Sequence, residues 1–178
     1  FLTESSAPVC YPGPMTNLSS PLTLLIVADD GLIRAGLAAL LAPETGLHVV
    51  GQCDGGPEVD RLVQQHAPDL LLWDLGWDFG EEASAALLER LGDFAARLPV
   101  LGLLPGEEDP RPLWARGVAG LLPRQTDGER LAAALLAAAA GLTVVDPDHR
   151  SLLTSPLDEA PAPDLIEALT PREEEVLA

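Results

Sequence analysis

Lysine is absent from this 178-residue chain, whose ten basic residues are all arginine. A chain without lysine cannot form a Schiff base through a lysine side chain and cannot supply the lysine of a Walker phosphate loop. Its 28 acidic residues give a formal charge of −18. This balance argues against nucleic-acid binding by these residues alone, because phosphate contacts need clustered cations.

Cysteines and long apolar runs are also scarce. Cys10 and Cys53 have no metal-ligand neighbour at the usual spacing, so we expect a reduced, cytoplasmic chain. The longest apolar run, residues 131–145, is shorter than the roughly 18 residues of a membrane span. It lies between Arg130 and Asp146 and predicts a helix followed by a strand-like exit. The N-terminus has no signal-peptide pattern, and we expect no membrane partner.

Proline and charge divide the chain into four parts. Residues 1–20 contain three prolines and predict a flexible lead, which is either an upstream extension or partly an artificial leader. Residues 21–145 predict one domain. Residues 146–168 predict an acidic, proline-rich linker, and residues 169–178 predict the beginning of a further helical domain.

Within residues 21–145, short apolar runs alternate with helical patterns. The runs are too short for helices and too uniformly apolar for half-exposed strands, which suits parallel strands covered on both faces. The run at 47–53 contains His48 and Gln52, as an edge strand would. This alternation predicts an α/β fold, a doubly wound (βα)5 domain. We expect strands at 24–27, 47–53, 70–73, 100–104 and 118–122, and helices at 32–41, 59–66, 81–98, 112–116 and 128–140.

Acidic residues follow two of the predicted strands. Asp29 and Asp30 come after the first strand, and Asp74 ends the third. Ligands of open α/β sheets bind beyond the carboxyl ends of strands, so neighbouring strands would bring the three carboxylates into one shallow pocket. Such a cluster needs a cation, and its hard oxygen donors suit Mg²⁺. The alternative is that these aspartates cap the following helices, which is strongest for Asp30.

Four stretches resemble one known family. They are residues 29–37 (DDGLIRAGL), 48–51 (HVVG), 68–75 (PDLLLWDL) and 117–122 (GVAGLL). Their order and spacing resemble the receiver domain of bacterial two-component response regulators, over roughly residues 22–145. The resemblance implies a flavodoxin-like fold with strand order 2-1-3-4-5 and a place in a phosphorelay that begins at a sensor histidine kinase.

The resemblance also implies roles for individual residues. Asp74 is cast as the phosphoacceptor, and Asp29, Asp30, Asp74 and the Gly76 carbonyl are cast as Mg²⁺ ligands. No second acid follows Asp74 at the two-residue spacing of aspartate-nucleophile phosphatases, because Gly76 stands there. We therefore expect no enzymatic activity.

Several positions depart from the family pattern. Leu104 stands where the family has a Ser or Thr hydroxyl, Arg124 replaces the family lysine, and Leu121 replaces the switch aromatic. Leucine can neither donate nor accept a hydrogen bond, and arginine is longer and planar, so neither change is conservative. After the phosphoacceptor the usual Met-Pro turn is absent, and Trp77 and Phe79 could cover the pocket.

These departures predict an atypical receiver whose phosphorylation switch is weakened or lost. Two alternatives stay open. The first is a conventional receiver phosphorylated on Asp74, and the second is a pseudoreceiver that binds a small molecule or peptide near Trp77 and Phe79.

The end of the chain carries a second pattern, residues 169–177 (LTPREEEVL). Thr170 suits a helix N-cap, Pro171 the first helical position and Glu173 a capping box. The stretch resembles the opening of a LuxR-type (NarL/FixJ-like) helix-turn-helix domain. This implies a transcriptional regulator that binds DNA only through its C-terminal domain, whose recognition helix is not among these residues.

The helix predicted at 128–140 is rich in small residues. Ala132, Ala133, Ala137 and Ala140 allow close approach either of the domain's own sheet or of a partner helix in a homodimer. Both alternatives stay open at this point.

Overall fold

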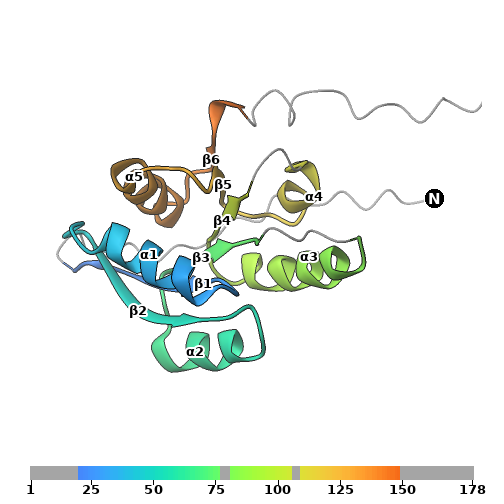
Figure 1. The fold of residues 1–178 in the computed structure, drawn as a ribbon, viewed down its shortest axis with the longest axis horizontal. Helices are drawn as coiled ribbons and strands as arrows, with labels where there is room; N and C mark the ends of the chain where they lie inside the picture. Colours follow the sequence, from blue (N-terminus) through green and yellow to red (C-terminus); the bar gives the residue numbers. More distant parts are fainter. Residues whose placement is uncertain (1–19, 77–80, 106–108, 149–178) are drawn as a thin grey trace, which may run out of the picture.

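The computed structural model describes residues 20–76, 81–105 and 109–148. These residues form a parallel sheet flanked by helices on both faces (Figure 1). In chain order the elements are β1 (Leu22–Val27), α1 (Gly31–Leu41), β2 (Leu47–Cys53), α2 (Glu58–His66), β3 (Leu70–Asp74), α3 (Glu81–Ala95), β4 (Val100–Leu104), α4 (Arg111–Trp114), β5 (Gly120–Pro123), α5 (Gly128–Ala139) and β6 (Val144–Val145).

The strand order is β2-β1-β3-β4-β5-β6, which confirms the predicted flavodoxin-like order for the first five strands. All residues of β3 and β4 are buried, as their uniformly apolar sequences predict. The strand β2 lies at an edge and is mostly half-buried, in agreement with its polar positions.

A sixth strand extends the described sheet beyond the five that were predicted. The residues Val144 and Val145 pair in parallel with Gly120 and Leu121 of β5. A Cβ atom at Gly120 would lie 3.1 Å from the Val144 Cβ, so glycine at this position permits the close approach of β6. The short strand-like exit after α5 is therefore part of the sheet.

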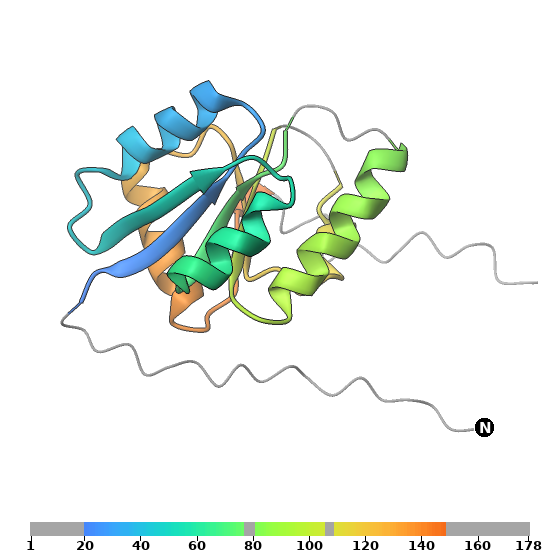
Figure 2. The ribbon, with the colours of Figure 1, turned by 90° about the horizontal axis from the view of Figure 1, so that it is seen from below.

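The helices form two layers, which Figure 2 shows from a second direction. Helices α1 and α5 cover one face of the sheet, where Leu37, Leu41 and Leu135 pack on it. Helices α2, α3 and α4 cover the other face, where Phe94 and Leu113 pack. Alternate residues of the central strands point into these two cores.

The helices bury one face and leave some apolar residues at the margin of that face exposed. In α1, Leu37 and Leu41 are buried, whereas Leu40 is 38% exposed. In α5, Ala132 is buried against the sheet, while Ala133 and Ala140 are exposed. Among the described residues no helix combines the length and hydrophobicity needed to cross a bilayer.

Some predictions fall outside the described residues. They concern the lead at 1–19, Cys10, the pocket residues Trp77 and Phe79, and the chain from residue 149 onward. The four-part division of the chain likewise stays a prediction.

Candidate functional site

The predicted site lies at the carboxyl ends of the central strands. Strands β1 and β3 are neighbours, with Val27 opposite Trp73, so the acids that follow them share one edge of the sheet. On the other side of β3, Asp74 is opposite Leu103 of β4. Strand β5 then ends at Pro123, opposite Leu104, and Arg124 follows immediately.

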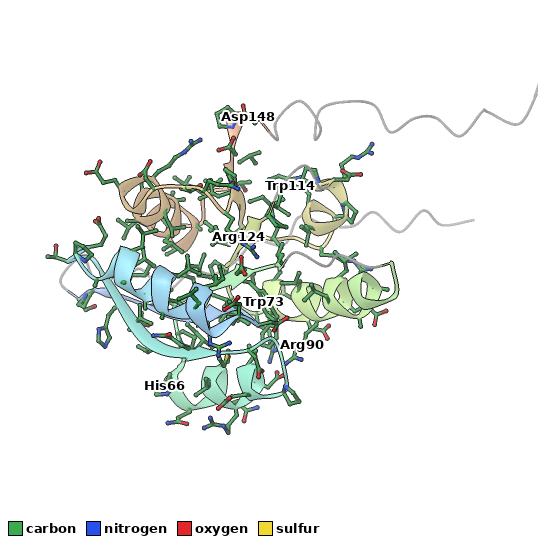
Figure 3. All side chains as sticks on the ribbon, viewed as in Figure 1. His66, Trp73, Arg90, Trp114, Arg124 and Asp148 are labelled. Carbon is green, nitrogen blue, oxygen red and sulfur yellow. The ribbon has the colours of Figure 1, made fainter. Side chains whose placement is uncertain are left out.

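Arg124 forms a two-point ion pair with Asp74. Its Nε donates to Asp74 Oδ1 at 2.6 Å, and its Nη2 donates to Oδ2 at 2.8 Å. The two side chains are 10% and 2% exposed, respectively. The Arg124 backbone N–H donates to the Leu104 carbonyl at 2.8 Å, which fixes where the side chain starts. Figure 3 shows Arg124 in the middle of the domain, between the helix layers.

This geometry is the fork that matches guanidinium to carboxylate. Charge-assisted, bidentate hydrogen bonds are short and among the strongest in proteins. Both oxygens of Asp74 therefore have an arginine donor. The planar fork distinguishes Arg124 from a lysine, which would present a single ammonium to the same carboxylate.

The electrostatic environment of Asp74 combines opposing effects. Burial raises the pKa of Asp74 above its ordinary value, and the negative charge of Asp29 adds to the rise. The hydrogen bonds and positive charge of Arg124, with a hydrogen bond from the Gly76 backbone, limit that rise in pKa. Arg124 is thus the cation that makes a carboxylate tolerable at this buried position.

The two acids after β1 have other partners. Asp30 is the N-cap of α1, and its Oδ1 accepts from the Leu32 backbone N–H at 2.7 Å, which confirms the capping interpretation for this residue. Asp29 Oδ1 accepts from the Gly55 backbone N–H at 2.9 Å. Arg34 donates to the carbonyls of Ala28 and Asp29 and so anchors the same loop. Both Asp29 and Asp30 are exposed.

The three acids do not form a metal cluster in this arrangement. Within the ranges that the structure describes, no three His, Cys, Asp or Glu side chains are grouped closely enough to hold a metal ion. Asp74 is paired with Arg124, and Asp30 caps α1. As arranged here the donor set does not fit Mg²⁺, and the ligand role of Asp29, Asp30, Asp74 and Gly76 remains a prediction.

Two of the three altered switch positions, Leu104 and Leu121, are apolar and enclosed. Leu104 and Leu121 are each 0% exposed. A Cβ atom at Gly102 of β4 would lie 3.1 Å from Leu121 Cδ2, so the Leu121 side chain fills the space above that glycine. Neither position offers a hydrogen bond to a group on Asp74.

The contact between Arg124 and Asp74 was not predicted from the sequence. Arg124 was singled out only as a replacement for a lysine. The signal that could have found the contact is positional, since Arg124 follows β5 at the same edge where Asp74 ends β3. An arginine is long enough to cross the end of the intervening β4, which carries no polar side chain there.

Comparisons with known proteins identify the family of this chain. No family model matches the chain. The chain is 30% identical over 161 residues to the nitrate/nitrite response regulator protein NarL of Escherichia coli K12, covering 88% of the chain and 74% of that protein. It is 32% identical over 130 residues to the response regulator GacA of Pseudomonas aeruginosa, covering 71% of the chain and 59% of that protein. The chain belongs to the NarL/LuxR family of response regulators.

Solved structures of NarL/LuxR-family receivers share the fold. The isolated receiver domain of RcsB from Salmonella enterica serovar Typhimurium, determined with the phosphomimetic BeF3−, has a TM-score of 0.62 at 17% identity, covering 75% of this chain and 99% of that one. A LuxR family DNA-binding response regulator from Silicibacter pomeroyi has a TM-score of 0.56 at 26% identity, covering 72% and 98%. The predicted response-regulator family is therefore confirmed.

Proposed function

We propose that the described domain is an atypical receiver of a transcriptional response regulator. In this receiver Arg124 binds the side chain of the phosphoacceptor Asp74 and so weakens the phosphorylation switch. The observation that carries this proposal is the two-point contact of Arg124 with both oxygens of Asp74. Two further observations support it, the buried Leu104 and the buried Leu121.

The chemistry of phosphorylation explains why this contact matters. A carboxylate oxygen of Asp74 would have to form a bond to phosphorus while the bond from phosphorus to the donor's leaving group breaks. Each oxygen keeps a second lone pair, but the Asp74 side chain is 2% exposed and Arg124 lies across both of its oxygens, so a phosphodonor has no open approach. Arg124 would therefore have to withdraw first, which adds the cost of separating a buried ion pair.

The response to a phosphoryl group would be weak for a separate reason. A ligand shifts a two-state equilibrium only by its differential interaction with the two states. Leu104 offers no hydroxyl to attract a phosphoryl group on Asp74. The Leu121 side chain already fills the space over Gly102, so there is no empty site into which it could move in response to phosphorylation.

The rest of the proposal follows the family. We infer a cytoplasmic regulator without enzymatic activity. It binds DNA through a helix-turn-helix domain that begins near Thr170. Its activity is set by dimerisation or by another signal. The alternative is a conventional receiver that is phosphorylated on Asp74 by a sensor histidine kinase. The position of Asp74 at the end of β3 favours this alternative.

A phosphorylation experiment separates the two alternatives. The 178-residue chain is incubated with acetyl phosphate and Mg²⁺, then analysed by intact mass and light scattering. We expect little phosphorylation of the wild type and a clear increase in the double variant Leu104→Thr with Arg124→Lys, which restores the family residues. Adding Asp74→Asn to the double variant should abolish the increase. Stoichiometric phosphorylation of the wild type with a change in oligomer size would establish the conventional receiver instead.

A further inference from the structure

Strand β6 attaches the chain after α5 to β5, the strand that immediately precedes Arg124. The Val144 backbone N–H donates to the Ala119 carbonyl at 2.9 Å, and the Asp146 N–H donates to the Leu121 carbonyl at 3.2 Å. Figure 1 shows β6 beside β5 at the edge of the sheet. The predicted linker begins at residue 146, so its first residue is already bound to the sheet.

Asp146 is an unusual residue for the start of a linker, because its side chain is 3% exposed. Its Oδ2 accepts from Arg130 Nη2 at 2.6 Å, and its Oδ1 accepts from the Asp148 backbone N–H at 2.9 Å. A buried carboxylate is costly unless it is paired and hydrogen-bonded. Both oxygens of Asp146 are satisfied only while residues 144–148 stay on the sheet and Arg130 stays in reach. We call residues 144–148 together with Arg130 the latch.

The latch and the Asp74 site share the same short segment of chain. Arg124 is the first residue after β5, and Asp127, three residues later, caps α5 by accepting from the Arg130 backbone N–H at 2.8 Å. The turn between them is closed by a hydrogen bond from the Thr126 N–H to the Pro123 carbonyl at 3.1 Å. The segment is therefore held at Arg124 by Asp74 and at Arg130 by Asp146.

Strand β5 is correspondingly held on both sides. On the β4 side, the Arg124 N–H donates to Leu104 and its side chain reaches across to Asp74 of β3. On the outer side, β6 pairs with Gly120 and Leu121. Figure 3 shows Arg124 in the interior of the domain and Asp148 beyond the end of β6.

We propose that the latch is a conformational device that couples the Asp74–Arg124 ion pair to the start of the linker. When Arg124 leaves Asp74, the end of β5 and the turn after it lose their inner anchor, and the latch opens more often. The coupling rests on the ion pair described above, but it does not require that phosphorylation is the event that releases Arg124. The device transmits the state of the site by local opening of residues 144–148, a low-stability element at the edge of the sheet.

Hydrogen exchange of the whole 178-residue chain tests the proposal without any phosphodonor. Exchange is followed in peptides that cover Val144–Val145 and Asp146, with β3 peptides as a check that each variant is folded. Arg130→Ala should raise exchange at residues 144–148 at least about tenfold and leave β3 unchanged. Arg124→Ala should raise exchange at residues 144–148 as well, although Arg124 does not belong to the latch. Arg61→Ala, which removes an exposed ion pair on α2, should change neither region.

A paired replacement guards against a variant that fails to fold. Asp74→Leu with Arg124→Met removes both charges and leaves no unpaired buried charge, so the domain should stay folded. Faster exchange at residues 144–148 in this variant supports the coupling. Unchanged exchange there in a folded variant would overturn the coupling, and unchanged exchange in Arg130→Ala would overturn the latch itself. Neither result depends on whether Asp74 can be phosphorylated, so the proposed function is tested separately.

Discussion

Arg124 and Asp74 connect two strands that are not neighbours. Asp74 ends β3, Arg124 follows β5, and their hydrogen bonds of 2.6 and 2.8 Å pass over the end of β4, where Leu104 is buried. A side-chain contact thus connects the ends of β3 and β5 over the end of β4, at the edge of the sheet where the phosphoacceptor is predicted. We therefore expect the stability of the domain and the reactivity of Asp74 to depend on the same pair.

The first prediction concerns the cost of removing Arg124. The Arg124→Ala variant leaves a buried carboxylate without its cation, so its free energy of unfolding should fall by about 3 kcal/mol. Urea denaturation measures the change. The control Arg61→Ala removes an ion pair whose side chains are 60% and 49% exposed, and should cost at most about 0.5 kcal/mol. Equal losses of unfolding free energy in the two variants would mean that the buried pair stabilises the domain no more than an exposed pair does.

The second prediction concerns pH. Burial raises the pKa of Asp74 above 3.8, and this pKa should rise further without Arg124. A carboxyl whose pKa is raised in the folded state stabilises the fold below its ordinary pKa, and that stabilisation is lost as the pH rises through the folded pKa. The stability gap between the wild type and Arg124→Ala should therefore be smallest near pH 4 and widen toward pH 7. A gap that narrows with increasing pH would contradict this assignment.

The third prediction concerns the strand-five position where the family has an aromatic residue. Leu121 is fully buried, and its Cδ2 lies 3.1 Å from where a Cβ on Gly102 would stand. Leu121→Tyr overpacks this space and should lower the free energy of unfolding by about 1–3 kcal/mol. Thermal unfolding measures it, with Leu121→Met as the volume-matched control. A fully stable tyrosine variant would show that the site can accept the aromatic and that the relay position is still open.

The fourth prediction concerns dimerisation through α5. Leu136 is 47% exposed on α5, and Leu40 of the adjoining α1 is 38% exposed, so the two helices leave apolar surface facing outward. If this surface forms the proposed homodimer, Leu136→Glu should convert the dimer to a monomer in light scattering. Leu32→Glu, at a position on α1 that is 80% exposed, is the control and should leave the dimer intact. A monomeric wild type would refute the dimer.

The sequence was sufficient to predict the fold because β3 and β4 are uniformly apolar and the helices between strands have a clear period. It also located Asp74 at the end of a strand and Asp30 at a helix N-cap, since both are local patterns. A strand-like exit after α5 was predicted, but its place as a sixth strand of the sheet was not, because two residues are too short to produce a periodic signal and the pairing depends on the absence of a side chain at Gly120.

The contacts of Arg124 and Arg130 were beyond local patterns for a different reason. The chain has 28 acidic residues, so the sequence alone does not show which of them each arginine binds. The register of the strands determines the partner. Arg124 reaches Asp74 because β5 ends beside β4 at Leu104, and Arg130 reaches Asp146 because β6 pairs with β5. The absence of lysine drew attention to position 124. Only the strand register shows which carboxylate Arg124 binds.

The most direct test of the account is a titration of the wild type with Mg²⁺ and beryllofluoride, followed by the fluorescence of tryptophan. Trp73 precedes Asp74 and is buried against Phe94, with ring centroids 5.7 Å apart, so it reports on this edge of the sheet. We predict no saturable change in the wild type at concentrations where the double variant Leu104→Thr with Arg124→Lys responds, with apparent affinities that differ at least about tenfold, or about 1.4 kcal/mol. A wild-type response as tight as that of the double variant would contradict the claim that Arg124 closes the Asp74 site.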